Sequence, residues 1–454
     1  MEAVNTFELS VEFKDRFQLA LDDQDDEFIT KSFEGVNSAD ISAFLDEFDG
    51  EECKYVFDLL SVEIGAEILE ELEEDVREDF IKQFTATEIA AFVEQMDSDD
   101  GTDILYEMSV ADRNEVIRQI GDEEKASHLM ELLEYDEDVA GGLMAKELIT
   151  ANYNWSIRQC IEEIRKQAEN VEKIYSVYVI NDRGDLLGKV GLKKIIIASD
   201  STKVADIYDE ELVSVETSTT EEEVSSIMQK YDLESVPVVN ARGRLVGRIT
   251  IDDVIDVITE NAEEERQLMT GVSSDVEEDD SVWRISKARL PWLIIGMAGG
   301  LVGAQFMGFF REEIIIVPAL AFFIPLITAS GGNVGIQSSS IVVQSLANPS
   351  VFADSMFKRL LKVFSVAVVN GIILALMVFG SVILFMSDQS LAATVSIALF
   401  SVVLLASFTG TVTPLVLNKI GVNPALASGP FITTTNDLLG LAVYFSVAHL
   451  LYNL

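Results

Sequence analysis

Several residue types that commonly build binding sites are scarce in this sequence. Its 454 residues include two cysteines and two histidines, too few for a disulfide framework or for a zinc site made of thiolates and imidazoles. Basic residues are also few, with 32 Lys and Arg against 78 Asp and Glu. A chain this negative repels the phosphates of nucleic acids. We therefore expect no nucleic-acid partner and instead a cationic ligand.

The charge is divided unevenly along the chain. Residues 1–282 hold 24 basic and 73 acidic side chains, whereas residues 283–454 hold 8 basic and 5 acidic ones. An acidic soluble half joined to an apolar half is typical of a multidomain membrane protein. The low cysteine content fits a reducing, cytosolic location for the soluble half.

A repeat of 24 residues runs through the beginning of the chain, in segments that start at Ala43, Glu67, Ala91 and Glu115. In each segment, apolar residues recur at helical spacing along one face, and a second short helix follows. Neighbouring helices can bury these faces only against one another. We therefore predict an α-helical solenoid, the N domain, over residues 1–138.

A second duplication follows, in which residues 176–190 repeat as residues 235–249 at a constant offset of 59. Each copy is an apolar strand, a polar turn and a second apolar strand, preceded by an amphipathic helix at 156–166 or 220–231. This β-α-β-β-α unit, made twice over residues 139–258, resembles a tandem pair of CBS domains. CBS pairs are α/β regulatory modules, not catalysts.

The resemblance also implies a possible nucleotide site in the second copy. Gly247, Thr250 and Asp253 match the positions with which nucleotide-binding CBS domains hold a ribose. The first copy reads Gly188-Lys-Val-Gly-Leu-Lys-Lys194 and lacks both the Thr and the Asp. ATP or another adenosine nucleotide is therefore expected at one site at most.

Residues 259–282 are polar and acidic. The part up to Met269 contains strong helix formers and no helix breaker, so it is predicted to be a linking (plug) helix between the soluble and membrane halves. A solvated linker is an equally simple interpretation of the same composition.

The remainder, residues 283–454, is predicted to be a transmembrane domain with five helices. Apolar runs of sufficient length lie at about 291–310, 314–346, 359–385, 389–417 and 425–451. Basic residues gather on one side of these spans: Arg284, Lys287, Arg289, Lys358, Arg359, Lys362 and Lys419, against Arg311 on the other. The positive-inside rule then predicts a multi-pass protein of the cytoplasmic (inner) membrane, with the N-terminus in the cytosol and the C-terminus outside.

Two polar motifs interrupt these apolar runs. The second span contains Pro318, Pro325 and the motif Ser330-Gly-Gly-Asn333-Val-Gly-Ile-Gln337, which together predict a broken helix whose freed carbonyls line an ion path. The fifth span contains Gly429-Pro-Phe-Ile-Thr-Thr-Thr-Asn-Asp437. Asp437 is the one acidic residue within the predicted spans, and an Asp at a helix centre costs about 2.5–3.5 kcal/mol, so it should face a watery cavity or a cation.

Together with the junction Asp138-Val-Ala-Gly-Gly-Leu-Met144, these features resemble the MgtE family of magnesium channels and transporters, in the same order from about residue 40 to the end. The family implies a homodimer with its pore on the two-fold axis, lined by the second and fifth spans. It also implies cytosolic domains that bind Mg²⁺ and close the pore. On this resemblance, Asp437 lies at the pore centre and Asn333 is a pore-lining amide, and Asp232, Asp253, Asp256 and Glu264 are among the interdomain metal ligands.

The full sets of candidate residues follow from the two motifs and from the acidic surface. The pathway set is Asp437, Asn333, Gln337, Thr434, Thr435, Gly331 and Gly332. The regulatory metal set is Asp232, Asp253, Asp256, Glu260, Glu264, Glu265, Asp97, Asp99 and Asp100. Without a cation these acids repel, and Mg²⁺ between them would reverse the sign of that interaction.

Other functions remain open from the sequence. The same architecture could carry Co²⁺, Mn²⁺ or Ca²⁺, or exchange Mg²⁺ against Na⁺. An intramembrane enzyme or a non-transporting receptor is a further alternative, but no Ser/His/Asp grouping and no His-Glu-x-x-His motif supports an enzyme. The chain also lacks a nucleotide-hydrolysis loop, which predicts passive or secondary ion movement.

Overall fold

The computed structural model describes residues 10–45, 48–72, 74–168, 171, 173–272, 276, 281–347, 356–427 and 429–452. Much of the predicted linker after Met269, at 273–275 and 277–280, therefore lies outside the described residues. The chain divides into two compact units, Met1–Ile258 and Thr259–Leu454. The domain boundaries given above at 138, 258 and 282 stay predictions.

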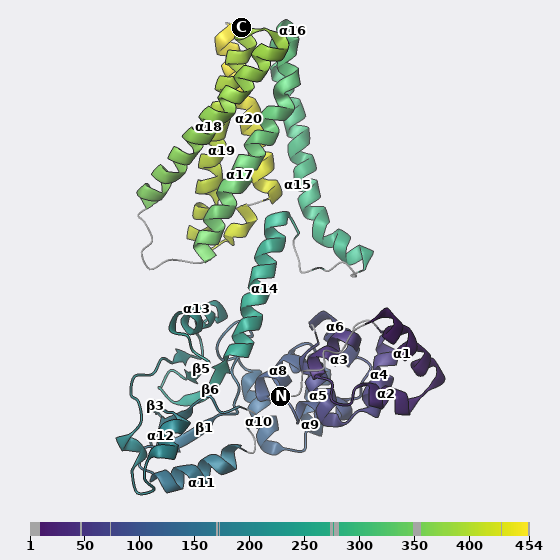
Figure 1. Cartoon of the computed structure of the whole chain (residues 1–454), viewed down its shortest axis with the longest axis vertical. Helices are drawn as coiled ribbons and strands as arrows, with labels where there is room; N and C mark the ends of the chain where they lie inside the picture. The colour runs from purple at the N-terminus through teal and green to yellow at the C-terminus, as the bar shows by residue number, and fades with distance from the viewer. Residues whose placement is uncertain are drawn as a thin grey trace. The chain divides into compact units, whose positions relative to one another are not determined.

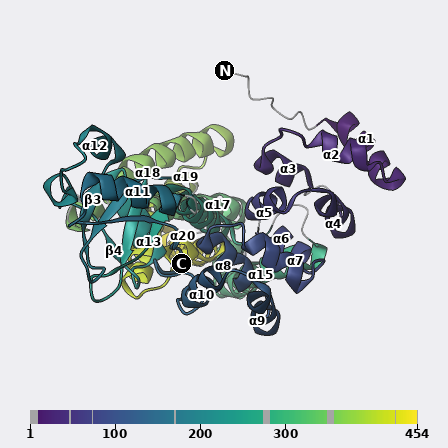
Figure 2. The same ribbon diagram turned by 90° about the horizontal axis from the view of Figure 1, so that it is seen from below.

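Short helices make up the first part of the first unit (Figures 1 and 2). They are α1 (Val11–Asp23), α2 (Asp26–Ser32), α3 (Ser38–Leu45), α4 (Gly50–Leu59), α5 (Val62–Glu70), α6 (Glu74–Ile81), α7 (Ala86–Val93), α8 (Ser98–Tyr106), α9 (Val110–Gln119) and α10 (Glu123–Leu132). Polar caps define where they begin: Asp49, Ser61, Thr85, Ser109 and Asp122 each accept a hydrogen bond from the first turn. Such caps satisfy backbone N–H groups that have no partner inside the helix.

In the structure, many helices of the repeat pack against the helix two places further along the chain. Helix α3 contacts α5, α5 contacts α7 and α7 contacts α9, while α2 contacts α4 and α4 contacts α6. Phe57 shows how the repeats interlock, since its ring centroid lies 4.8 Å from Phe80, 5.5 Å from Phe84 and 5.9 Å from Phe92. The repeated helices are thus confirmed, whereas the regular superhelix of a solenoid stays a prediction.

The duplicated segment forms two three-stranded sheets, which confirms the β-α-β-β-α units. The first copy consists of β1 (Ile149–Asn152), α11 (Ile157–Gln167), β2 (Val177–Ile180), β3 (Leu186–Val190) and α12 (Leu192–Ile197), followed by the 3₁₀ turn η2 (Val204–Asp206). The second consists of β4 (Val215–Glu216), α13 (Glu221–Tyr231), β5 (Ser235–Val239), β6 (Leu245–Thr250) and the start of α14 (Ile251–Thr270). In each sheet the first two strands are parallel and the last two are antiparallel.

The predicted linking helix is present but longer than expected. Helix α14 is continuous from Ile251 to Thr270, so the last helix of the second copy and the linking helix are one element. The side chain of Asp253 accepts hydrogen bonds from Thr250 N (2.9 Å) and Thr250 Oγ1 (2.8 Å). This bond pattern caps the helix where it leaves the sheet.

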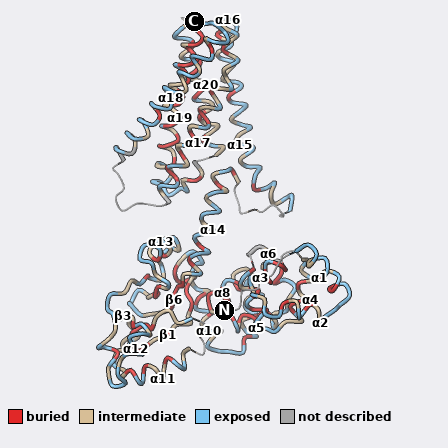
Figure 3. The backbone as a smooth tube through the Cα atoms, viewed as in Figure 1, coloured by how far each residue is buried: buried red, intermediate tan, exposed pale blue. Residues whose placement is uncertain are grey.

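The second unit holds five helices that are long and apolar enough to cross a membrane, counted among the described residues. Its elements are α15 (Val282–Phe309), α16 (Arg311–Ile316), η3 (Pro318–Phe323), α17 (Ile324–Ala347), α18 (Met356–Met386), α19 (Gln389–Lys419), η4 (Pro424–Ala427) and α20 (Gly429–Tyr452). Helix α19 is the most buried of the five, and α15 and α18 are largely exposed (Figure 3). Helices α17 and α20 both pack against α19.

The predicted interruption of the second span is found only in part. The chain breaks at Val317 and η3, as predicted at Pro318, but helix α17 runs without interruption through Pro325 and Ser330–Gln337. The glycines do not break the helix because neighbouring helices occupy the space beside them. A Cβ at Gly335 would overlap the amide of Asn436, and one at Gly331 would lie 3.1 Å from Val402 Cγ1. The glycines therefore allow close helix packing.

The aromatic core of the repeats yields a stability test. Phe57 is 4 % exposed, so Phe57→Ala should lower the free energy of unfolding of this region by about 3–5 kcal/mol through loss of contacts and a cavity. Cys53 and Cys160 are both buried and free, one near Phe57 and one in the first sheet unit. In the full chain, Cys53 should become reactive to a thiol reagent at a lower urea concentration, while Cys160 changes little.

The matched control is Leu19→Ala, because Leu19 is exposed on α1. Its effect should stay within about 0.5 kcal/mol. Equal shifts at both cysteines in Phe57→Ala would show that the repeats and the sheets unfold together.

Candidate ion pathway and cytosolic metal site

Helices α17 and α20 meet through small residues on α17. Gly332 lies against α20, since a Cβ there would be 3.1 Å from Thr433 Cγ2 and 3.7 Å from Asp437 Oδ1. Gly331, Gly332 and Gly335 are all buried. The predicted pathway glycines thus bring the backbone of α17 next to the Asp437 carboxylate.

The predicted polar residues lie on the other face of α17. Asn333 and Gln337 are exposed, and so are Pro325, Ala329 and Ile341. These residues recur every four positions, so they form one stripe along the helix. Asp437 is half-buried, and its carboxylate lies near Gly332, the residue that precedes Asn333. The structure therefore brings Asp437 together with the segment that carries Asn333.

The two predicted threonines lie differently. Thr434 packs its methyl group against Gly299 of α15, where a Cβ would overlap it. Thr435 is half-buried. Of the two, Thr434 is assigned here to the packing of α15 on α20.

Two residues of this region were missed by the sequence prediction. Asn436 is 2 % exposed and accepts a hydrogen bond from Thr409 Oγ1 at 2.7 Å. Thr433 donates to Gly429 O at 2.9 Å and faces Gly332. Helical spacing could have indicated Thr433, because Thr433 and Asp437 are four residues apart and share a face.

The end of α14 packs against the membrane helices. Leu268 forms a small core with Val343 of α17 and with Ala425. A Cβ at Gly429 would lie 2.6 Å from Met269 O, and one at Gly271 would lie 2.7 Å from Pro430 Cγ. Both glycines have positive φ, +57° and +87°, so side chains are disfavoured there for backbone reasons as well. The last turn of α14 therefore abuts the first turn of α20.

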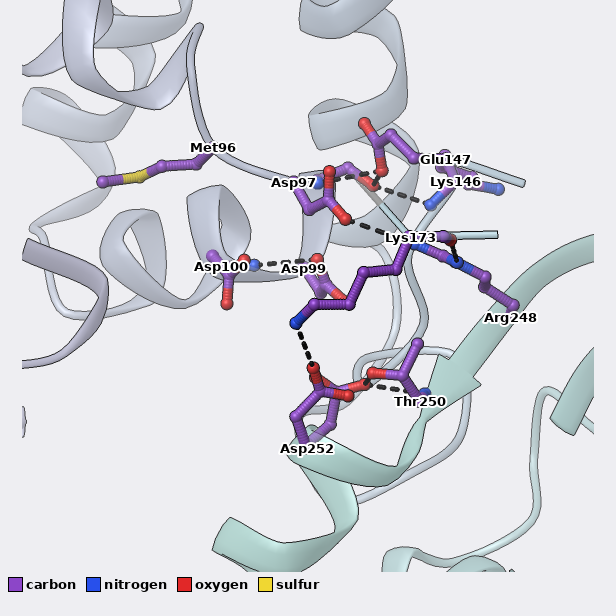
Figure 4. A network of polar contacts seen from close by, with 12 residues as sticks. Met96, Asp97, Asp99, Asp100, Lys146, Glu147, Lys173, Arg248, Thr250 and Asp252 are labelled. Atoms are coloured by element: carbon purple, nitrogen blue, oxygen red, sulfur yellow. Dashed lines mark hydrogen bonds and ion pairs between the residues drawn. The ribbon is translucent and has the colours of Figure 1, made fainter. Parts of the chain in front are cut away.

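A group of acids forms the second candidate site, within the first unit (Figure 4). We call Asp97, Asp99, Asp100, Glu147 and Asp253 the acid cluster. Oxygen atoms of Asp97, Asp99 and Glu147 lie within 4.8 Å of one another. Opposite oxygens around an octahedral Mg²⁺ are about 4.2 Å apart, twice the usual bond length. Small side-chain rotations would thus let these residues fit the ion.

Position and hydrogen bonding hold the cluster together. Asp97 precedes α8 and Asp99 lies in its first turn. Glu147 Oε2 accepts from Ser98 N at 3.0 Å and from Ser98 Oγ at 2.6 Å. Because Glu147 follows the Gly141-Gly142 junction and Ser98 begins α8, these bonds tie the helical repeats to the sheet units.

Electrostatics shows that the cluster is short of positive charge. Burial, and then the charges of Asp100 and Asp253, raise the pKa of Asp99 well above its usual range. Burial and the charge of Glu70 raise the pKa of Asp100 to about 8. Burial also raises the pKa of Asp253. Such shifts mean that the carboxylates are not fully neutralised by their neighbours.

Two basic side chains reach into the cluster. Lys125 Nζ lies 3.1 Å from Glu147 Oε1 and also donates to Met96 O. Burial raises the pKa of Glu147, but Lys125 and the Ser98 hydrogen bonds outweigh it, so the net pKa is lowered. Arg248 Nη2 lies 3.4 Å from Asp97 Oδ2. Glu147, Lys125 and Arg248 were not predicted, because only the tertiary fold brings them to α8.

The other predicted regulatory acids lie outside this cluster. Asp232 is exposed and ends α13 in a left-handed conformation. Burial and the charge of Glu71 raise the pKa of Asp256. Glu260 and Glu264 are exposed on the second-unit part of α14, and burial and Glu264 raise the pKa of Glu265.

The residues predicted to bind a nucleotide contact other parts of the protein. A Cβ at Gly247 would lie 2.6 Å from Met144 Sδ, so the backbone there packs on the junction. Thr250 and Asp253 are bonded to each other. A narrow pocket nearby lies between the two copies, lined by Lys173, Tyr175 and Tyr178 of the first and by Ser235 and Arg248 of the second.

Comparisons with known proteins match each part of the chain. A divalent cation transporter family model matches residues 324–447, an MgtE intracellular N domain model matches 36–138, and a CBS domain model matches 138–201 and 204–260. A protein of Thermus thermophilus named magnesium transporter MgtE is 31% identical over 96% of this chain and 97% of its own length. The chain belongs to the MgtE family of magnesium transporters.

Further comparisons agree with this assignment. A magnesium transporter MgtE of Enterococcus faecalis is 34% identical over 72% of each chain. The crystal structure of the soluble part of a magnesium transporter has a TM-score of 0.50 and 26% identity, and covers 55% of this chain and 98% of that one. The predicted fold class is confirmed in its parts: an MgtE N domain, a CBS pair and five candidate membrane helices. The matched MgtE models describe a transporter and its domains, with no catalytic family among them.

The acid cluster predicts a pH dependence of stability without divalent cations. Carboxyls with a raised folded pKa stabilise the fold below their unfolded pKa of about 4, and this stabilisation is lost as pH rises through the folded value. Asp100 has a pKa of about 8 and Asp103, raised by burial, of about 7. In a chelator, the urea midpoint of the protein, followed by circular dichroism, should fall between pH 5 and pH 8.

Asp100→Asn should flatten this slope, because the amide carries no charge at either pH. The control Asp15→Asn changes an exposed acid of α1 and should keep the slope. A midpoint that rises with pH in the unmodified protein would contradict the assignment of these raised pKa values.

Proposed function

We propose that this chain forms a homodimeric Mg²⁺-selective channel or transporter for magnesium uptake across the cytoplasmic membrane, closed when cytosolic Mg²⁺ binds its N and CBS domains. The observation that carries the proposal is the approach of Gly332 on α17, next to Asn333, to Asp437 on α20. A hydrated Mg²⁺ gives up its water reluctantly and is recognised by a few carboxylates and many neutral oxygens. Asp437 supplies the carboxylate, and Asn333 and Gln337 supply amide oxygens.

The exposure of this stripe supports a dimer. Asn333 and Gln337 are exposed in the single chain, and amides in contact with lipid tails would lack hydrogen-bond partners. A second copy that faces the same stripe would enclose these amides around water and an ion. A two-fold axis there would also pair Asp437 with its counterpart, which doubles the charge available to a divalent cation.

The acid cluster and α14 support the regulatory part of the proposal. Asp253 belongs to the cluster and lies in the first turn of α14, while the last turn of that helix packs on α17 and α20. Metal binding at the first turn would therefore act on the helix that abuts the Asp437 helix. The acids Asp256, Glu260, Glu264 and Glu265 follow along α14, and Asp232 ends α13, as further candidate ligands.

Two secondary parts of the proposal rest on the sequence. The basic residues near one side of the spans support a cytosolic N-terminus and an external C-terminus in the inner membrane. Adenine nucleotide binding to the second CBS copy, near Gly247, Thr250 and Asp253, is proposed as an additional regulatory contact. The narrow pocket that includes Lys173 and Arg248 offers positive charge for its phosphates.

The pathway proposal predicts the effect of changing Asp437. Asp437→Asn should reduce Mg²⁺ uptake into liposomes by at least about tenfold, because the variant lacks the carboxylate that offsets partial dehydration of the ion. Asn333→Ala should reduce uptake less, since it removes a neutral oxygen. Competition by Ca²⁺, Mn²⁺ and Co²⁺ in the same assay measures selectivity and tests the alternative cargo ions.

Asp388→Asn is the matched control. Asp388 caps α19 by accepting from Leu391 N at 3.0 Å, and Asn caps helices equally well. Its uptake should equal that of the unmodified protein. Normal uptake by Asp437→Asn would refute the pathway, and equal losses in Asn333→Ala and Asp437→Asn would refute the order of importance.

The gating proposal predicts a conformational response of the full chain to Mg²⁺. Limited proteolysis in detergent should become slower between chelator and roughly 10 mM Mg²⁺, a range typical of weak oxygen-ligand sites. Asp99→Asn should raise the Mg²⁺ concentration at half protection about tenfold, which corresponds to ~1.4 kcal/mol. An unmodified protein whose digestion pattern ignores Mg²⁺ would rule out magnesium gating even if transport is observed.

A further inference from the structure

Arg248 is the unusual residue of the acid cluster. It is 5 % exposed and lies on β6, two residues before the strand ends at Thr250. Fully buried arginines are rare unless their charge is paired. Its carboxylate partner is Asp97, at 3.4 Å between Arg248 Nη2 and Asp97 Oδ2, so a residue of the CBS pair supplies positive charge to the beginning of α8.

The guanidinium also has two neighbours that carry no negative charge. Arg248 Nη1 donates to Lys173 O at 3.0 Å, and the guanidinium carbon lies 5.6 Å from the centre of the Tyr175 ring. Within the described residues, Arg248 Nε is buried and has no hydrogen-bond partner. The guanidinium is therefore held, but its donors are incompletely used, and its contact with Asp97 is long for a charge-assisted hydrogen bond.

Lys125 offers a comparison within the same cluster. Its Nζ lies 3.1 Å from Glu147 Oε1 and also donates to Met96 O, so the ammonium has two close partners. Arg248 is the more weakly held of the two cations. If a divalent cation enters among Asp97, Asp99 and Glu147, the repulsion from two positive charges favours the release of the weaker one.

We propose that Arg248 is a built-in counter-cation of the acid cluster, which cytosolic Mg²⁺ must displace from Asp97 in order to bind. This inference rests on the proposed gating function and specifies how its concentration threshold is set. The displaced guanidinium keeps the Lys173 carbonyl and the Tyr175 ring, so its release leaves the charge with two favourable contacts. In this scheme the side chain lowers the affinity for Mg²⁺ and stabilises the metal-free arrangement.

The test uses the full chain and the proteolysis assay described above, with Mg²⁺ as the only added cation. Arg248→Gln should lower the Mg²⁺ concentration at half protection by about fivefold or more, because the competing charge is absent. Arg248→Lys keeps the charge and should shift it less. The control Arg158→Gln removes an exposed arginine that pairs with Asp200 on the first CBS copy, and it should leave the midpoint unchanged.

The outcomes separate the two proposals. If the unmodified protein responds to Mg²⁺ and Arg248→Gln has the same or a higher midpoint, the role of Arg248 is overturned and gating stands. If the unmodified protein does not respond, gating fails and the role of Arg248 fails with it.

A second measurement covers the case in which Arg248→Gln does not fold. An experimental structure of the unmodified protein in saturating Mg²⁺ should show the guanidinium separated from Asp97 and still bonded to Lys173 O. Mg²⁺ bound to Asp97 with Arg248 still within 4 Å of it would overturn the inference.

Discussion

Carboxylates that a fold brings together in a low-dielectric setting cannot all be ionised unless a cation lies among them. Two carboxylates about 4 Å apart repel by roughly 4 kcal/mol at an effective dielectric of 20. In the acid cluster, burial first and then the charges of neighbouring acids raise the pKa values of Asp99, Asp100 and Asp253. The arrangement is stable only with bound protons, basic side chains or metal, and the competition among these three makes it sensitive to its ionic surroundings.

The membrane unit places the carboxylate of Asp437 beside a close approach of two helices. Gly332 allows α17 to approach Asp437, and Gly335 leaves room for the amide of Asn436. Asn436 is in turn bonded to Thr409 of α19. Three helices are thereby fixed around one polar point, so the position of Asp437 depends on contacts that carry no charge themselves.

Local sequence patterns predicted the helices and strands well. The features that they did not predict depend on tertiary contacts. The 24-residue period, the offset of 59 and the apolar runs each report a structure formed within a short stretch of chain, and these elements are present. The expected break at Ser330–Gln337 failed because glycine weakens an isolated helix, whereas here Asn436, Val402 and Thr433 fill the space beside it. Glu147 and Arg248 escaped prediction because their partners are distant in sequence, Ser98 and Asp97 respectively.

The contact between α14 and α20 has a mechanical consequence. The carbonyl of Met269, at the negative end of one helix dipole, lies beside Gly429, at the positive end of the other. Two helices joined end to end in this way attract each other without any ion between them. The contact between α14 and α20 is therefore stabilised by backbone atoms. In the gating proposed above, opening of the pathway would have to separate this contact, and a cation bound at the acid cluster would oppose that separation.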